Sequence, residues 1–211
     1  MNHRGLTRSL ILSCALLLSA AACGPTTPAG PDLGYLKMSH PVYSPNHTKT
    51  IRLISNWGQD TALLETLRPA ANTAAAQLSA ITGVNFVVSG EVTPYAPTNG
   101  EIGIRIESGK CGANPDVWGC APDSLWTQDV NGRQMLSTQS IYIEPSQAQS
   151  SSAERKVTGI LHEIGHTLGM LHYNNTYQGS LQIMNDHITS ELQTYQEGDK
   201  NGLRSIVFYD N

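Results

Sequence analysis

The pattern of hydrophobic and polar positions predicts a domain that mixes strands and helices. Residues 101–107 alternate isoleucine with small or polar residues, which is typical of a strand with one buried face. An alanine- and leucine-rich stretch begins after Asp60, the expected helix cap, and continues to Ala80, with Pro69 as the expected kink or break. Three further strands are expected at residues 50–55, 85–89 and 140–144.

Turn signals and helix caps divide the second half of the chain. Asn131-Gly132 predicts a hairpin turn, and we assign the neighbouring Asp129 to turn chemistry rather than to calcium binding. The sequence therefore gives no support for a structural calcium site. Ser151 or Ser152 is expected to begin the next helix, which carries the motif described below.

The sequence HEIGHTLGMLH has the spacing of a catalytic metal site. His162 and His166 are four residues apart, so on a helix their imidazoles project from one face and can bind one cation. Gly169 can adopt the left-handed conformation that ends helices, and the turn would bring His172 to the same cation. Three histidines leave the fourth position of a tetrahedral zinc ion to water, which Glu163 could reach as a general base. The alternative is an amphipathic surface helix that carries the pattern by accident.

HExxHxxGxxH followed by a methionine turn is the signature of the metzincin zinc endopeptidases, and this chain resembles a small member of that superfamily. Met184 is the candidate for the turn, where it would form an apolar floor beneath the metal. The resemblance implies an α+β fold with a twisted, mostly parallel sheet, an antiparallel edge strand, an active-site helix, the methionine turn and a C-terminal helix. A substrate peptide would add to the sheet edge, which we expect somewhere between Ile102 and Leu136.

Within the superfamily the chain is most similar to the matrixins, over about residues 140 to 209. The similar sequence segments are the motif itself and the C-terminal EGDKNGLRSIVFYD, which resembles the last matrixin helix. No histidine occurs between His47 and His162, so we predict one catalytic zinc ion and no second, structural one. Tyr173 follows the third ligand where matrixins have serine, and Asp186 stands where astacin-like members have a tyrosine ligand.

The resemblance implies a zinc-dependent endopeptidase that acts on peptides or proteins, with a metal-activated water and Glu163 as the base. Tyr173, Tyr177 and Leu181 could form a hydrophobic specificity pocket, although surface positions are the simpler interpretation. Two other functions stay open. The chain could be a catalytically silent zinc-binding surface or adhesion module, or it could hydrolyse peptide crosslinks of a cell wall.

Two cysteines in the middle of the chain are expected to form a disulfide. Cys111 and Cys120 remain as an even pair in an oxidising compartment once the other two cysteines are assigned to the N-terminal region. A competing interpretation is a cysteine switch, because KCGANPDV resembles the matrixin propeptide segment whose thiolate blocks the zinc. Here, however, the segment lies inside the catalytic region and has a partner nine residues away. We favour the disulfide, and we expect that no propeptide keeps the enzyme inactive.

The N-terminal residues resemble an export signal. Arg4 and Arg8 precede an apolar run at residues 10–18, which is too short to span a membrane, and small residues lead up to Cys23. The sequence AAAC that ends at Cys23 resembles a bacterial lipobox, so we expect lipidation of this cysteine and attachment to a membrane that faces the periplasm or the cell exterior. Simple secretion after cleavage before Cys23 is the alternative.

Three regions are therefore expected: a signal peptide at 1–22, a proline- and glycine-rich tether at 23–47 and a catalytic domain at 48–211. His40 and His47, in the tether, are expected to be exposed bystanders rather than ligands.

Loss of residues 1–22 removes two arginines and no acidic residue, which leaves 11 basic against 17 acidic residues and a formal charge of −6. An acidic surface argues against nucleic-acid binding, and we expect a monomer.

Overall fold

Most of the chain beyond residue 30 is described by the structure, a computed structural model. The described residues are 31–38, 42–43, 47–98, 100–112, 114, 116–122, 126–128, 134–136, 139–187, 189, 192–206 and 208–209. Residues 32–211 form one compact unit. The expected signal peptide and Cys23 lie outside the described residues. Within the described ranges, no helix has both the length and the apolar character that a membrane crossing requires.

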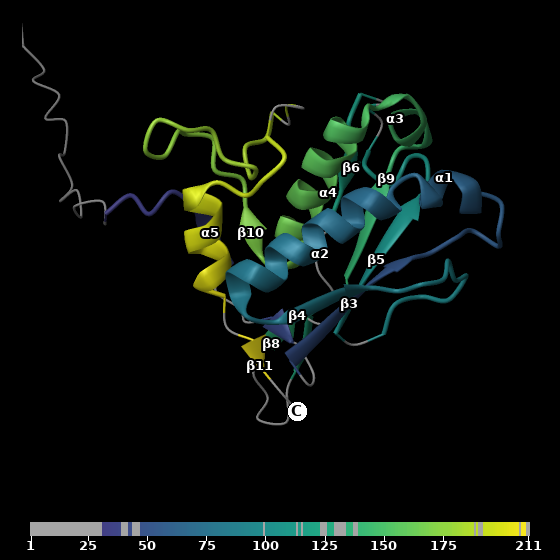
Figure 1. The fold of residues 1–211 in the computed structure, drawn as a ribbon, viewed down its shortest axis with the longest axis horizontal. Coiled ribbons are helices and arrows are strands. Elements are labelled where there is room, and N and C mark those ends of the chain that lie inside the picture. The colour runs from purple at the N-terminus through teal and green to yellow at the C-terminus, as the bar shows by residue number, and fades with distance from the viewer. Residues whose placement is uncertain are drawn as a thin grey trace, which may run out of the picture. The chain divides into compact units, whose positions relative to one another are not determined.

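A five-stranded, mostly parallel sheet forms the centre of this unit (Figure 1). β3 pairs in parallel with β4 and β5, β5 pairs in parallel with β9, and β6 is an antiparallel edge strand against β9. All four predicted strands are present, with ends shifted by at most two residues, and the edge strand falls inside the expected range. The order across the sheet is β4 (Asn85–Val88), β3 (Thr48–Leu53), β5 (Glu101–Ile106), β9 (Gln139–Ile143) and β6 (Gly119–Cys120).

The alanine-rich stretch forms two helices instead of one. α1 spans Thr61–Glu65 and α2 spans Arg68–Thr82, so the break falls before Pro69, which lies in the first turn of α2. Proline is tolerated there because the first N–H groups of a helix have no intrahelical partner. Asp60 precedes α1 but makes no side-chain cap; its Oδ1 accepts a hydrogen bond from the Asn56 N–H at 3.0 Å instead.

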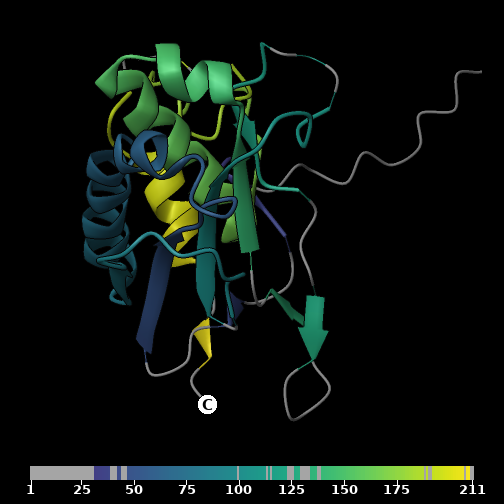
Figure 2. The same cartoon turned by 90° about the vertical axis from the view of Figure 1, so that its right-hand side faces the viewer.

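Three further helices follow β9. They are α3 (Pro145–Ser150), α4 (Ala153–Thr167) and α5 (Glu197–Arg204). Ser152 is the N-cap of α4, as predicted, because its hydroxyl accepts a hydrogen bond from the Arg155 N–H. α2 and α4 pack side by side on one face of the sheet (Figures 1 and 2). The motif-bearing helix therefore has one side against the hydrophobic core, and Gly159 and Glu163 in its interior lie beside the edge-strand region.

Short strands extend the unit on both sides of the motif. β1 (Leu36–Lys37) pairs antiparallel with β10 (Met170–Leu171). A four-stranded sheet has the order β11 (Phe208–Tyr209), β2 (Val42–Tyr43), β8 (Gln134–Leu136) and β7 (Trp126–Gln128). β7 and β8 pair antiparallel, as a hairpin requires, while the predicted turn at Asn131-Gly132 and Asp129 lie outside the described residues.

The N-terminal boundary of the folded unit differs from the expectation. The unit begins at Asp32 rather than at Thr48, and β1 and β2 both belong to it. The proline and glycine content of this region indicated a spacer, but short strands pair through backbone groups, which composition does not reveal. The described part of the expected tether, from Asp32 to His47, is thus part of the domain.

Candidate metal centre

Helix α4 and the turn that follows it bring the three histidines of the motif together. His162 and His166 lie one helical turn apart on α4, and Gly169 has a φ of 89°, the left-handed conformation predicted for it. The chain then reverses into β10, and His172 follows this strand directly. Ligating atoms of the three residues lie within 4.8 Å of one another, the one group of this kind among the described residues.

The Nε2 atoms of these histidines face a common point. His166 Nε2 lies 3.0 Å from His162 Nε2 and 3.1 Å from His172 Nε2, and the third separation is 3.3 Å. A tetrahedral ion bound to imidazole nitrogens at about 2.0–2.1 Å, as zinc is, would separate these nitrogens by about 3.3–3.4 Å. The observed separations between the three Nε2 atoms are slightly shorter, so the rings need to move apart only slightly to hold such an ion.

Hydrogen bonds at the opposite ring nitrogens fix the direction of two imidazoles. His162 Nδ1 lies 2.8 Å from the Ile183 carbonyl oxygen, and His166 Nδ1 lies 2.9 Å from that of Met170. A carbonyl oxygen can only accept, so Nδ1 carries the proton and Nε2 offers its lone pair to the shared point. Lone pairs at this separation repel one another unless a cation lies between them. The donor set therefore fits a metal ion.

Burial keeps two of the imidazoles neutral. Loss of solvation, with a smaller effect from the nearby His166 ring, lowers the pKa of His162 from 6.5 to about 3. Burial likewise lowers the pKa of His166 to about 4. Neutral imidazole is the form that binds metals, so both ligands are available over the physiological pH range.

Glu163 lies beside the histidines with a buried side chain. It is 2% exposed, and burial raises the pKa of its carboxyl group to about 8, while a hydrogen bond from the Ala121 N–H opposes this rise. Its Oε2 atom has no hydrogen-bond partner among the described residues. A buried carboxyl oxygen without a partner is costly, and such atoms occur where a ligand or a reacting group is to be bound.

Met184 lies beneath the motif helix, in the turn that follows the third histidine. It is fully buried, and its sulfur packs so closely on Gly165 that a side chain at that position would collide with it. The Met184 carbonyl accepts a hydrogen bond from the Tyr173 N–H at 2.8 Å, which ties the turn to the residue after His172. Met184 therefore packs against the helix that carries two of the histidines, and its role as a floor beneath a metal ion stays a prediction.

Asp199 holds this turn in place and was missed from the sequence. Its carboxylate accepts hydrogen bonds from the N–H groups of Ile183 at 2.8 Å and Met184 at 3.2 Å. The same carboxylate accepts from the Gln196 N–H at 2.9 Å, as part of the capping box of α5. Burial raises the pKa of Asp199, and these backbone hydrogen bonds oppose the rise. The capping-box spacing was the available signal, although it indicates only a helix start.

The segment Asp32–Met38, here called the strap, was also missed. It runs along β10 from one side: the Met38 N–H donates to the Gly169 carbonyl at 2.7 Å. The Tyr173 hydroxyl reaches both carboxylate oxygens of Asp32 at 2.8 Å, and Lys37 Nζ donates to the Ser205 carbonyl beyond α5. The strap therefore braces the strand that leads to His172.

An open cleft of about 660 Å³ runs past the histidines and Glu163. Tyr173, Tyr177 and Leu181 do not line it, so the expected hydrophobic pocket is not built from them. Tyr173 is instead 5% exposed and bonded to the strap, and Tyr177 packs on Gly34. Asp186, bonded to Asn174, does reach the cleft but is not part of the histidine group. The remaining cleft residues are Met38, Asn114, Asp116, Val117, Trp118, Gly119, Cys120, Ala121, Pro122, Gln139, Arg155, Leu171 and His187.

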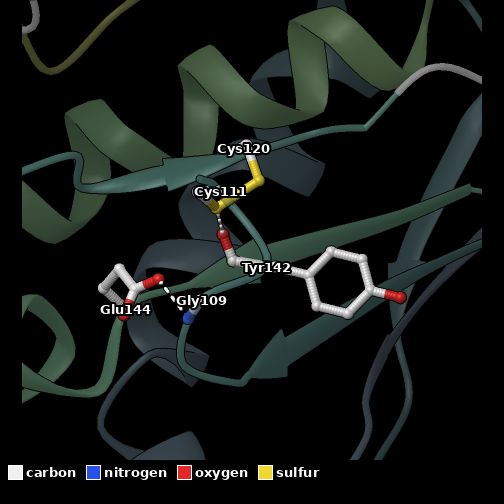
Figure 3. The surroundings of a disulfide bond; sticks show 5 residues. All are labelled: Gly109, Cys111, Cys120, Tyr142 and Glu144. Carbon is white, nitrogen blue, oxygen red and sulfur yellow. Dashed lines mark hydrogen bonds between the residues drawn. A yellow bond between two sulfur atoms is a disulfide. The ribbon is translucent and has the colours of Figure 1, made fainter. Parts of the chain in front are cut away.

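The predicted disulfide between Cys111 and Cys120 is present, with a Cα–Cα distance of 5.4 Å (Figure 3). Neither sulfur is a free thiol, which removes the cysteine-switch interpretation. The Cys111 sulfur also lies 3.5 Å from the Tyr142 carbonyl oxygen. Because a disulfide sulfur carries no hydrogen, this is a close contact rather than a hydrogen bond.

Comparison with known proteins supplies no assignment, because no family model matches the chain and no curated protein is significantly similar to it. The function must therefore be inferred from the chemistry of the site. Three histidines positioned for one metal ion, a buried carboxyl group beside them and an open cleft are the features from which to infer it.

Proposed function

We propose that this chain is a zinc-dependent endopeptidase of the metzincin type. The observation that carries the proposal is the convergence of three imidazole Nε2 atoms, 3.0–3.3 Å apart, beside the buried carboxyl group of Glu163 in an open cleft. A structural zinc site is closed by four protein ligands, whereas catalytic sites keep one position for water or substrate. Three ligands facing a cleft match a catalytic site.

His162, His166 and His172 would hold the metal ion, and neutral imidazole is a common ligand of zinc. A bound zinc ion would polarise the scissile carbonyl group and lower the pKa of a water molecule towards about 7. The hydrogen bonds from Nδ1 of His162 and His166 to backbone carbonyls keep these two rings in the ligating tautomer.

Glu163 would act as the general base. Burial raises the pKa of its carboxyl group to about 8, and a cation held by the adjacent histidines would lower it. The ionised carboxylate can then accept a proton from the attacking water and deliver it to the leaving amine. The Ala121 N–H holds one carboxyl oxygen, which leaves the unpartnered Oε2 for this proton transfer.

The edge strand that lines the cleft favours an extended peptide as the substrate. Edge strand β6 lines it, and β6 pairs with β9 on one side and with no other described strand. Backbone groups on the outer side of such a strand can bind a peptide of many sequences as an additional strand. The metzincin resemblance of the motif, with Met184 beneath the helix, supports the same inference.

Replacement of Glu163 by glutamine tests the proposal. We expect E163Q to retain about one equivalent of zinc and to lose about 10³-fold or more of its peptide hydrolysis, because the amide cannot accept the proton. The matched control is E154Q, an exposed glutamate in the first turn of the same helix. Zinc content and turnover of a fluorogenic peptide are measured on each. Undiminished turnover in zinc-loaded E163Q contradicts the role given to Glu163.

A substrate comparison separates the three candidate functions. Denatured protein and purified cell-wall peptides are each incubated with the wild type, with and without a chelator. Chelator-sensitive cleavage of the denatured protein supports the endopeptidase. Cleavage of wall crosslinks alone indicates a crosslink hydrolase, and zinc binding without turnover of either indicates a silent binding module.

A further inference from the structure

The disulfide closes the loop that forms one wall of the cleft. Cys111 and Cys120 bracket this loop, and Cys120 itself lies in edge strand β6. The described residues of the loop that reach the cleft are Asn114, Asp116, Val117, Trp118, Gly119 and Cys120. The covalent bond is thus part of the substrate-facing wall and not of a remote surface.

The backbone hydrogen bonds between β6 and β9 would by themselves hold this edge strand only weakly. Its register with β9 covers two residue pairs, Gly119 with Ile143 and Cys120 with Tyr142. One further hydrogen bond, from the Glu144 N–H to the Trp118 carbonyl at 3.2 Å, continues the pairing. A ladder this short at the edge of a sheet is expected to fray. An additional constraint on β6 therefore matters for its order.

The disulfide supplies that constraint by joining β6 to a segment that is itself tied to β9. The Gly109 N–H donates to the Glu144 carboxylate at 2.9 Å, and the Cys111 sulfur contacts the Tyr142 carbonyl (Figure 3). Because Cys111 is anchored on the β9 side, its bond to Cys120 holds β6 against β9. The limited freedom of the closed loop keeps the strand extended before any peptide arrives.

Trp118, just before β6, and Gly119 within it both contact the motif helix. A Cβ atom at Gly159 would lie 2.5 Å from the Trp118 ring, so this indole packs directly on the helix backbone, and its Nε1 donates to Ser151 Oγ. Gly119 lies in ordinary contact with Glu163, because a Cβ atom there would be 3.5 Å from Glu163 Cγ. These contacts fix the side of β6 that faces the helix, whereas the disulfide helps to hold the strand against β9.

We propose that the Cys111–Cys120 disulfide is a positioning element for substrate binding: it preorganises β6 as the strand to which a peptide pairs. This inference rests on the proposed endopeptidase function. Without the disulfide, β6 becomes ordered only when a peptide pairs with it. The free energy needed to order the strand then weakens peptide binding. Once a peptide is bound it restores the strand from the outer side, and the chemistry at Glu163 proceeds as before. The defect therefore lies in KM and not in kcat.

The double variant C111S/C120S tests this inference in the full, zinc-loaded chain. We expect KM for a peptide long enough to span β6 to rise about tenfold, with kcat changed less than about twofold and zinc content unchanged. The matched control is F86L, in β4 at the opposite edge of the same sheet, which lowers stability without touching β6. An unchanged KM, or equal effects of both variants on KM, overturns the proposal.

Amide hydrogen exchange gives a readout that does not depend on turnover. In C111S/C120S we expect the amides of residues 119–121 to exchange at least about tenfold faster than in the wild type, while those of β5 keep their protection. Equal exchange in β6 of both proteins refutes the positioning role even if no substrate is cleaved. Faster exchange confined to β6 together with an inactive wild type would contradict the endopeptidase proposal while leaving the disulfide's ordering role intact.

Discussion

Asp199 links the C-terminal helix to the first metal ligand through two hydrogen bonds in series. Its carboxylate accepts the Ile183 N–H, and the Ile183 carbonyl in turn accepts the Nδ1 proton of His162. A ligand whose second nitrogen is held in this way keeps its orientation when the metal is absent. Asp199 therefore positions His162 through the backbone of Ile183.

Substitution of Asp199 by asparagine should weaken metal binding. One amide oxygen cannot serve the three backbone N–H groups that the carboxylate accepts, and the amide NH₂ would face a donor. We expect D199N to lose about 10–100-fold in zinc affinity, measured by competition with a chromogenic chelator. E197Q, an exposed change in the same helix turn, should retain wild-type affinity. Equal affinities of D199N and E197Q would exclude a role for Asp199.

The buried carboxyl group of Glu163 should give the metal-free protein a pH-dependent stability. Burial raises its pKa from 4.5 to about 8, so the folded state keeps a proton that the unfolded state releases. The stabilising contribution of this group is complete below pH 4.5 and is lost as the pH rises through about 8. Relative to E163Q, the free energy of unfolding of the wild type should fall by at most about 1.4 kcal/mol per pH unit between pH 5 and 8.

Urea unfolding of both proteins in the presence of a chelator, at several pH values, measures this difference. Glutamine has no titratable proton, so the comparison cancels the other buried groups, including Lys49, whose pKa burial lowers to about 7. Parallel pH profiles of the wild type and E163Q would show that Glu163 does not titrate in this range.

At the level of elements, the strap supports β10 and hence His172. A chain that starts at Asp32 keeps the pairing of Leu36 with Leu171, and a chain that starts at Val42 loses it. We expect the longer form to bind zinc like the full chain and the shorter form to bind it at least about tenfold more weakly. Chelator competition measures both. A shorter form with unchanged affinity would show that the strap is dispensable for the site.

The elements could be predicted where their signal is local. The alternation at Ile102, Ile104 and Ile106 predicts β5 because one face of the strand is buried, and these three side chains are at most 6% exposed. The break expected at Pro69 is present and falls directly before it, because proline is accommodated in the first turn of the helix that follows. The strap was assigned to a tether because a two-residue strand has no periodicity to detect.

At the scale of the whole molecule, Cys23 is expected to decide where the protein is found. Lipidation at this residue would attach the folded unit, which begins at Asp32, to a membrane. We expect the wild type to sediment with membranes and C23A to appear in the soluble exported fraction, as measured by fractionation and immunoblotting. Membrane association of C23A equal to that of the wild type would contradict the anchor.

The candidate site was predictable only in its local part. His162, Glu163, His166 and His172 lie within eleven residues, so helix geometry and one glycine relate them. Asp199 and Asp32 act on the same site from opposite ends of the chain, through hydrogen bonds to a turn and to a tyrosine. Nothing in the spacing along the chain encodes such contacts, because they depend on how distant elements pack.

Contacts that involve residues from Asp32 to Ser205 have a consequence for synthesis of the chain. A growing polypeptide that has passed His172 already carries every ligand, yet it lacks the carboxylate of Asp199 and the partner of Lys37 near the far end. The three-histidine site can therefore gain its full set of supporting contacts only when almost the entire chain is free to fold. In the proposed peptidase, activity would begin only after Ser205 has emerged.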